Sequence, residues 1–339
     1  MTQQPESYDV AIVGARIGGA VLAALLGDAG HRVLLVDRAS FPSDAISTHF
    51  FRGSGLAGVL GELGLLDEID ATGAPRLSSE YLYTDGRAEP TVTDPQDPGS
   101  LGYNLSVRRL ALDALLVRRA TRSASVRLRE RSVVTDLVRD DGRVVGVRIG
   151  DEVVPIRALF YVYLTGFEAP AAGAGATPDG PEFSFRGDEL AYVFPSDAGV
   201  TCVAVSVSRD AFHQVRAGGL EAFGACIGRH RGLADRYRSA TVVSRLLGQG
   251  PQPSTVRVPA GPGWALVGDS GMRQDPWTGE GMDSAARSAR VLAEELDAQL
   301  RGRLAADAVI GRYHAARDAQ GLDNFHATVE GGRDLRTLG

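Results

Sequence analysis

The sequence predicts a mixed α/β fold, with a strand-helix-strand unit at the N-terminus and a sheet-rich part inserted further along the chain. Residues 8–13 form a β-branched run, residues 17–26 carry small and apolar side chains at helical spacing, and residues 32–36 form a second apolar run. This unit is about 30 residues long, the size of a βαβ element. Alternating runs between residues 79 and 207 indicate a second sheet, and residues 282–329 predict two closing helices.

The composition excludes several kinds of chemistry. Hydrophobic residues make up 44% of the chain and charged residues 23%, as in an ordinary globular protein. All 36 basic residues are arginine, so a P-loop lysine, a Schiff-base lysine and a lysine general base are excluded. The net charge of −6 argues against a nucleic-acid partner.

Metal binding and membrane insertion are not expected. Cys202 and Cys226 form no Cys-x-x-Cys pair, and the six histidines form no His-x-x-x-His pair. No apolar run reaches the roughly 20 residues that span a membrane, and the polar N-terminus lacks the basic segment of a signal peptide. We therefore expect a cytoplasmic protein without a membrane span, and the sequence does not indicate its oligomeric state.

A glycine-rich segment lies between the first strand and the first helix. Residues 14–19 read Gly-Ala-Arg-Ile-Gly-Gly, and glycines in this position let a pyrophosphate approach the N–H groups of the helix N-terminus. Asp37 follows about 20 residues on, at the end of the second strand, where a ribose is bound. We predict a Rossmann-type dinucleotide site for FAD or NAD; the alternative is a glycine-rich turn without a ligand.

Arg16 replaces the middle glycine of the Gly-x-Gly-x-x-Gly pattern. Its side chain either pairs with the pyrophosphate oxygens or fills the phosphate channel and leaves the fold empty. We expect pairing, because Gly14 and Gly19 still provide the turn and a guanidinium forms charge-assisted hydrogen bonds with phosphate.

A second motif near the C-terminus favours FAD over NAD. Residues 264–267 predict a strand that delivers Asp269, whose carboxylate can accept hydrogen bonds from the ribityl hydroxyls of a flavin. Residues 275–282 then read Asp-Pro-Trp-Thr-Gly-Glu-Gly-Met and open a helix near Met282. The exposed N–H groups of that helix can hold the flavin pyrimidine oxygen, which becomes anionic on reduction.

This pair of distant motifs resembles the p-hydroxybenzoate hydroxylase-type flavoproteins, which include the class A aromatic monooxygenases and the geranylgeranyl reductases. The loop at residues 43–49, Ser-Asp-Ala-Ile-Ser-Thr-His, and the Val-Arg-Arg-x-x-Leu-Asp helix at residues 107–113 also resemble this family. The resemblance covers most of the chain and is weakest at residues 163–185. One branch of the family carries arginine in the position of Arg16.

The resemblance implies a Rossmann-type FAD-binding domain with an inserted substrate-binding domain. The FAD-binding domain would comprise residues 1–78, 101–175 and 255–339, and the substrate-binding domain residues 79–100 and 176–254. It also implies an NAD(P)H-driven monooxygenase for an aromatic or polyketide-like small molecule, acting through a flavin C4a-hydroperoxide in a site that excludes water.

Candidate site residues follow from the motifs and the resemblance. The catalytic candidates are His49 and Arg52, although His49 could equally be a packed loop residue. One of Arg108 and Arg109 should face the cofactor, unless both lie on a solvated helix face. The candidate cofactor-binding residues are Gly14, Ala15, Arg16, Gly18, Gly19, Asp37, Arg38, Ser47, Thr48, Arg108, Arg109, Gly268, Asp269, Pro276, Gly279, Gly281 and Met282.

Two positions depart from the family pattern. The family carries an Asp-Gly pair after a buried strand; residues 156–164 form such a strand here, and Thr165 stands in the aspartate position. Ser288 stands where close relatives often have aspartate. Two alternatives to a flavoenzyme therefore stay open: a flavin-independent cyclase or isomerase that uses the cavity for positioning, and a non-catalytic ligand-binding protein.

Overall fold

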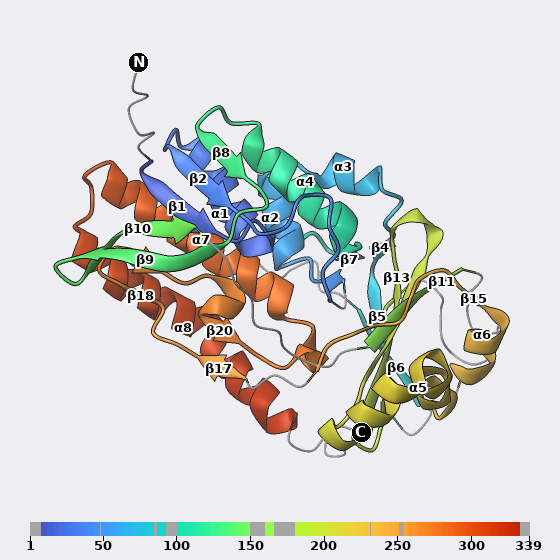
Figure 1. The fold of residues 1–339 in the computed structure, drawn as a ribbon. Coiled ribbons are helices and arrows are strands. Elements are labelled where there is room, and N and C mark those ends of the chain that lie inside the picture. The colour runs from blue at the N-terminus through green and yellow to red at the C-terminus, as the bar shows by residue number, and fades with distance from the viewer. Residues whose placement is uncertain are drawn as a thin grey trace.

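A computed structural model describes residues 8–47, 49–84, 87–92, 100–149, 160–165, 180–230, 232–250 and 254–332. The molecule has two parts (Figure 1). The N-terminal strands and helices pack with the C-terminal helices, and a larger, mostly antiparallel sheet with its own helices lies beside them. This architecture confirms the predicted mixed α/β fold with a sheet-rich second part.

A small parallel sheet forms the base of the first part. Strands β1 (Val10–Val13), β2 (Val33–Val36) and β8 (Val126–Arg129) pair in the order β1-β2-β8. The predicted βαβ unit is therefore confirmed, with β1 and β2 parallel. Among the described residues β1 pairs on one side only, and its last residue, Val13, is 55% exposed.

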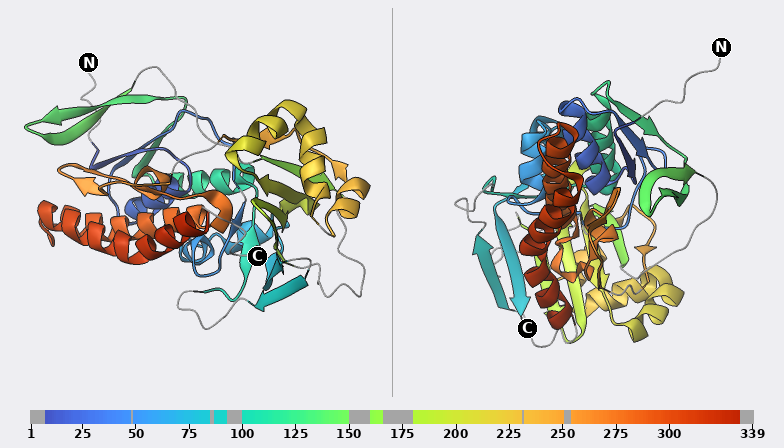
Figure 2. Two further views of the ribbon diagram at one scale, coloured as in Figure 1. Left: turned by 90° about the horizontal axis from the view of Figure 1, so that it is seen from below. Right: turned by 90° about the vertical axis from the view of Figure 1, so that its left-hand side faces the viewer.

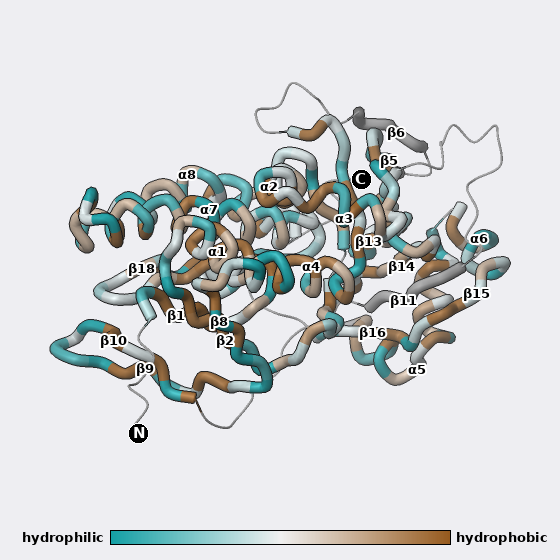
Figure 3. The backbone as a smooth tube through the Cα atoms, turned by 90° about the horizontal axis from the view of Figure 1, so that it is seen from above, coloured by the Kyte–Doolittle hydropathy of each residue, from teal (hydrophilic) through white to brown (hydrophobic). Residues whose placement is uncertain are grey.

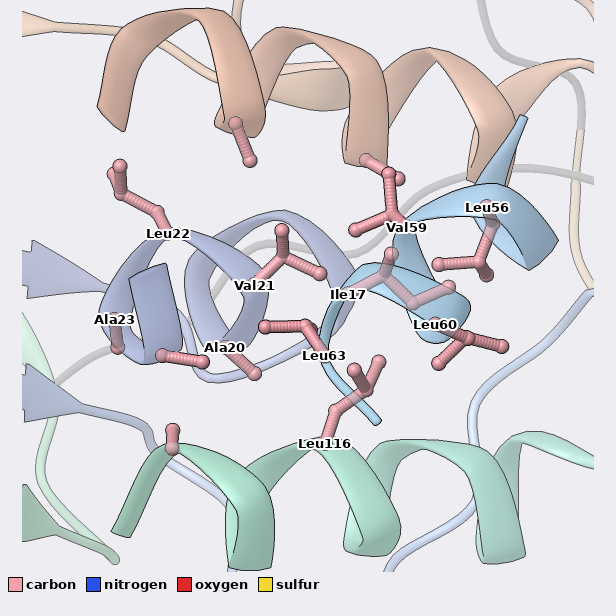
Figure 4. Packing of buried hydrophobic residues seen from close by; sticks show 14 of the residues in the cluster. Ile17, Ala20, Val21, Leu22, Ala23, Leu56, Val59, Leu60, Leu63 and Leu116 are labelled. Carbon is pink, nitrogen blue, oxygen red and sulfur yellow. The ribbon is translucent and has the colours of Figure 1, made fainter. Parts of the chain in front are cut away.

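Helix α1 (Ile17–Asp28) is the centre of the hydrophobic core. It packs against α4 (Arg109–Thr121), α7 (Gly281–Leu300) and α2 (Leu56–Glu62), as Figure 4 shows for their apolar side chains. Nine of its twelve residues are buried, because a helix that is apolar all round can only be stable inside the protein. The last helix, α8 (Ala306–Gly331), packs outside α7 (Figure 2).

The larger sheet has the order β15-β11-β14-β13-β12-β5-β6, with β16 also pairing with β11. Alternate residues of β13 face two different clusters: Ala191 and Val193 pack under the helices, whereas Leu190, Tyr192 and Phe194 face the first part. Both faces of β13 are therefore buried. The sheet's elements are β5 (Ser79–Thr84), β6 (Arg87–Val92), β11 (Phe160–Thr165), β12 (Glu182–Arg186), β13 (Glu189–Pro195), β14 (Thr201–Ser206), β15 (Thr241–Val242) and β16 (Leu247–Gly248), with helices α5 (Arg209–Gly228) and α6 (Ala234–Ser239).

Strand β11 contains the last residues of the strand predicted at residues 156–164 and lies in the larger sheet. Its residues pair with β14 over five positions, and Thr165 pairs with Thr241 of β15. This antiparallel register holds β11 in the larger sheet. The correspondence of Thr165 with the aspartate of the family stays a prediction, and Gly166 lies outside the described residues.

The remaining elements are short. The hairpin of β9 (Val134–Asp140) and β10 (Arg143–Ile149) turns at residues 141–142 and projects from the first part (Figure 2). The others are α3 (Leu66–Asp70), a small sheet of β3 (Phe50–Phe51), β7 (Asn104–Ser106) and β4 (Arg76–Leu77), and the pairs β17 (Thr255–Val256) with β20 (Met272–Arg273) and β18 (Ala260–Gly261) with β19 (Trp264–Ala265).

Hydropathy follows this architecture (Figure 3). The hydrophobic residues gather on α1 and the strands beside it, whereas the outer helix α8 alternates between apolar and polar residues. Among the described residues, none of the helices combines the length and apolar character needed to cross a membrane.

The close approach of α1 to the preceding turn makes a stability prediction. A Cβ atom on Gly19 would lie 1.7 Å from the Gly14 carbonyl oxygen and 3.2 Å from the Ile12 side chain. We expect Gly19→Ala to lower the free energy of unfolding by about 2–4 kcal/mol, because the backbone must shift. The control is Gly311→Ala in α8, where a Cβ meets open space and the helix should gain about 1 kcal/mol. Chemical denaturation measures both; equal stability of Gly19→Ala and the parent would contradict the packing argument.

Candidate functional site

The N-terminal and C-terminal motifs meet at the start of α1. A Cβ atom on Gly18 would lie 3.4 Å from the Val267 side chain and 3.6 Å from the Ala285 carbonyl oxygen of α7. A Cβ atom on Gly281 would lie 4.0 Å from Oδ1 of Asp269. The glycines thus let two segments about 250 residues apart in sequence come together at one place.

The turn at residues 14–19 has the geometry that a pyrophosphate requires. Gly14 has φ +99°, a backbone conformation that residues other than glycine rarely adopt. Arg16 is the N-cap of α1 and forms no side-chain capping bond. The N–H groups of the first helical turn have no partner within the helix, so they are able to donate to an anion.

Asp37 lies at the end of β2, where the ribose ligand was predicted. It is 7% exposed, and its carboxylate accepts the N–H groups of Ala15 at 2.7 Å and Ala39 at 2.8 Å. Each carboxylate oxygen has a second lone pair for a ribose hydroxyl. The adjacent Arg38 is exposed. Asp37 therefore fixes the glycine turn as well as offering acceptors beside it.

Arg16 is already paired in the structure. Its guanidinium donates to Asp113 at 2.7 Å and to the carbonyl and hydroxyl oxygens of Ser43 at 2.8 Å each, and it lies over the ring of Phe41. These contacts turn the side chain toward the loop after β2 and toward α4. A pyrophosphate contact by Arg16 stays a prediction, and it would have to share the guanidinium with Asp113.

Asp113 was not among the predicted site residues. Its fully buried carboxylate accepts hydrogen bonds from Arg16 and, at 2.9 Å, from Arg109 one turn earlier in α4. Two arginines share this one carboxylate, so part of their positive charge stays available to an anion near α1. The i, i+4 spacing of Arg109 and Asp113 on an otherwise apolar helix face was the sequence signal for this pair.

The two neighbouring arginines have different partners. Arg108 forms a two-pronged ion pair with Asp197, at 2.9 and 2.8 Å, and thereby ties α4 to the larger sheet. Burial would raise the pKa of Asp197, but the hydrogen bonds from Arg108 outweigh it and lower the pKa. Arg109, in contrast, acts electrostatically on Asp269. Of the two, Arg109 is the better placed for a cofactor contact.

His49 lies between the loop after β2 and α4. It is fully buried at φ +64°, and its Nδ1 accepts the backbone N–H of Arg109 at 3.2 Å. Burial lowers the pKa of His49 to about 3, so the ring is neutral at physiological pH. This environment favours a positioning role over proton transfer. The neighbouring Ser47 contacts Met282 through its hydroxyl, and Thr48 lies outside the described residues.

The segment after β19 presents Asp269 to the same place. Ser288 of α7 holds it, because its hydroxyl accepts the N–H of Gly268 at 3.0 Å. Asp269 itself is exposed, yet the surrounding protein raises its pKa by desolvation, against the opposing charges of Arg273 and Arg109.

The turn before α7 contains polar atoms without partners. The Thr278 hydroxyl and the Gln274 side-chain oxygen are buried and form no hydrogen bond within the described part of the chain. Gly279 has φ +71°, and the N-cap of α7, Glu280, makes no side-chain capping bond. Buried groups of this kind normally have partners, so they and the open helix N-terminus fit a bound polar ring such as the flavin pyrimidine. Pro276 begins this turn.

An aromatic cluster and Arg52 border this turn. Phe50 packs on Phe183 and Phe194 of the larger sheet, with ring centroids 6.0 and 5.5 Å apart. A Cβ atom on Gly279 would lie 3.7 Å from the Phe50 ring. Arg52 lies over the same ring and donates to Glu280 at 2.8 Å. The catalytic role predicted for Arg52 stays a prediction; the structure shows it as a member of a charged cluster.

Comparison with protein families supports this interpretation of the N-terminal motif. Residues 7–162 match the family described as FAD binding domain. The match contains the glycine turn, Asp37, the loop after β2 and α4.

Curated relatives match at low identity. Squalene epoxidase 2 of Arabidopsis thaliana is 31% identical over 153 residues, covering 43% of this chain and 25% of the relative. The chain spans about a quarter to a third of the squalene epoxidases it matches. A digeranylgeranylglycerophospholipid reductase of Methanosarcina acetivorans is 23% identical, covering 85% of this chain and 74% of the relative.

Solved structures share the fold over nearly the whole chain. PqsL of Pseudomonas aeruginosa, described as a probable FAD-dependent monooxygenase, has a TM-score of 0.77 and 23% identity over 97% of this chain and 96% of its own. The myxobacterial halogenase CndH has a TM-score of 0.82 and 24% identity over 96% and 82%. Residues 7–162 are thus similar to an FAD binding domain, and the solved flavoproteins share the fold of nearly the whole chain.

Proposed function

We propose that the protein is an FAD-dependent oxidoreductase: an NAD(P)H-driven monooxygenase that acts on an aromatic or polyketide-like small molecule. The observation that carries this proposal is the convergence of two open helix N-termini, those of α1 and α7, with Asp37 and Asp269. A dinucleotide with a flavin ring needs these groups in this order: acceptors for the ribose, donors for the pyrophosphate, an acceptor for the ribityl chain and donors for the pyrimidine.

Each group has a defined task in this proposal. Asp37 would accept the adenosine ribose hydroxyls, and the first turn of α1 would hold the pyrophosphate beside the pair of Arg109 and Asp113. Asp269 would accept the ribityl hydroxyls. The first N–H groups of α7, from Gly281 and Met282, would face the pyrimidine oxygen, where the helix dipole favours negative charge.

Bound FAD would supply the redox chemistry, with NAD(P)H as the reductant and O2 as the co-substrate. The protein's own residues would orient the substrate and exclude water. The cluster of Phe50, Phe183 and Phe194 borders the turn before α7 and offers an apolar wall on the side of the larger sheet. His49 is buried and neutral, which accords with a reaction that needs no protein nucleophile.

The relatives support the reaction class and the substrate class. The squalene epoxidases and PqsL are named as oxygen-inserting or monooxygenase proteins. PqsL also has a structure in complex with 2-aminobenzoylacetate, an aromatic compound. The unpartnered Thr278 and Gln274 atoms favour a bound cofactor over an empty scaffold.

The proposal predicts that Asp269 contributes to FAD binding. Asp269→Ala should weaken the FAD dissociation constant roughly 5- to 150-fold, the effect of 1–3 kcal/mol from unmet ribityl hydroxyls. Asp235→Ala is the matched control, because that carboxylate is exposed on α6, outside the site. Flavin fluorescence titration measures both variants, and circular dichroism checks their fold. A folded Asp269→Ala protein with parental affinity would remove Asp269 from the site.

A further prediction concerns Arg16. If Arg16 shares its charge between Asp113 and the pyrophosphate, Arg16→Gly should bind FAD more weakly, or at best equally, and with a smaller dependence on salt. Arg303→Gly removes an exposed arginine from a loop and is the control for net charge. Titrations at low and high salt measure the effect. A clear gain of FAD affinity in Arg16→Gly would mean that the arginine blocks the channel and that the parent protein does not use FAD.

A further inference from the structure

A buried carboxyl group joins the start of α7 to the segment before α2. Asp283 lies in the first turn of α7 and is fully buried. Its Oδ1 accepts the N–H of Leu56 at 2.8 Å, and both its oxygens lie 3.3 Å from the backbone nitrogen of Arg52. A Cβ atom on Gly55 would lie 2.1 Å from the same carboxyl oxygen. The Asp283 carboxyl therefore packs directly against Gly55, where a residue with a Cβ atom would not fit.

The charges around Asp283 do not balance if all the acids are ionised. Arg52 lies 2.8 Å from Glu280, 3.9 Å from Glu80 and 3.8 Å from Asp283. Arg287, also on α7, lies 2.9 Å from the other oxygen of Glu280. Two arginines thus face three carboxyl groups. Glu80 and Glu280 each retain some contact with solvent, whereas Asp283 has none. An ionised carboxylate is therefore least stable at Asp283, and Asp283 is the group that is protonated.

The position of this carboxyl is chemically significant. Asp283 directly follows Gly281 and Met282, whose N–H groups are proposed to face the flavin pyrimidine. A negative charge in the first turn lies within reach of those groups and opposes an anion held there. A neutral carboxylic acid leaves the helix dipole intact.

We propose that Asp283 is a positioning residue of the candidate flavin site: in its neutral form it keeps the N-terminus of α7 receptive to the reduced flavin anion, and its ionisation weakens that hold as pH rises. This inference rests on the proposed function. The groups that face Asp283 are Arg52 from the segment before α2, with Glu80 of β5 behind it, and Glu280 and Arg287 at the start of α7.

The pKa of Asp283 supports this assignment. Burial and the negative charge of Glu280 raise the pKa of Asp283 to about 7, against the opposing effects of Arg52 and of the Leu56 N–H. A group whose pKa is higher in the folded than in the unfolded state contributes stability that is complete below the unfolded pKa. That contribution falls as pH rises from about 4 to about 7 and is absent above this range.

Stability of the protein without FAD provides the first test. The melting temperature of the parent relative to Asp283→Asn should fall as pH rises from 4 to 7 and stay constant above 7, because asparagine cannot ionise. Asp307→Asn, in the first turn of α8 and exposed, should show no such trend. A difference between the parent and Asp283→Asn that does not change with pH would show that Asp283 is already ionised in the folded state, and would overturn the proposal.

Affinity for reduced FAD provides the second test. With FAD reduced anaerobically by dithionite, the parent should lose about three- to thirtyfold more affinity than Asp283→Asn between pH 6 and pH 8.5; the comparison between variants cancels the titration of the flavin itself. Asp307→Asn should follow the parent. Identical profiles for the parent and Asp283→Asn would overturn the proposal while leaving the proposed function intact. Failure of the parent to bind FAD at every pH would instead contradict the proposed function.

A second variant tests the proposal independently, in case the Asp283→Asn protein does not fold. Glu280→Gln removes a negative charge that favours the protonated form of Asp283. The pH at which affinity for reduced FAD falls should therefore move to a lower value in Glu280→Gln. An unchanged midpoint would show that Asp283 is not the titrating group.

Discussion

The packing of α1 against its preceding turn and against α7 is the constraint on which the candidate site depends. Gly19 lets the helix lie against the Gly14 carbonyl, and Gly18 lets it lie against Val267 and Ala285. Larger side chains at these glycines would separate the two motifs, and Asp37 and Asp269 would no longer share one site. The apolar surface of α1 stabilises this arrangement, because nearly all of the helix is buried among α2, α4 and α7.

Ion pairs of arginine with carboxylates orient the packed segments relative to one another. Three arginines near the site each pair with a carboxylate from a different segment: Arg108 with Asp197 in the turn between β13 and β14, Arg16 with Asp113 of α4, and Arg52 with Glu280 before α7. Planar guanidinium groups form directional, often two-pronged contacts, so these pairs fix the relative positions of the segments. They also place several ionisable groups in low-dielectric surroundings, where the protonation of one carboxyl affects the charge available to a ligand.

The parts of this structure that depend on local chemistry were predictable from the sequence. The turn at Gly14, the acidic residue at the end of β2 and the loop that opens α7 each follow from the conformation or charge of a few adjacent residues. The resemblance to a flavoprotein family added the link between the two distant motifs, and the family match covers the first of them, at residues 7–162.

The parts that depend on a choice between distant partners were not predictable. The apolar run that forms β11 would suit either sheet, and its antiparallel pairing with β14 places it in the larger one. Two adjacent arginines looked equivalent, yet Asp197 engages Arg108 and leaves Arg109 to Asp113. The sequence gives no signal that singles out Asp283; its burial beside Arg52 and Glu280 raises its pKa.

The central claim of this account is that the two motifs form one FAD site. The most direct measurement is the stoichiometry of FAD bound to the purified protein, determined from its visible spectrum after saturation with FAD and removal of the excess. The account predicts about one FAD per chain, with a flavin spectrum altered from that of free FAD. A colourless protein that retains no FAD, and whose melting temperature does not change with saturating FAD, would contradict it.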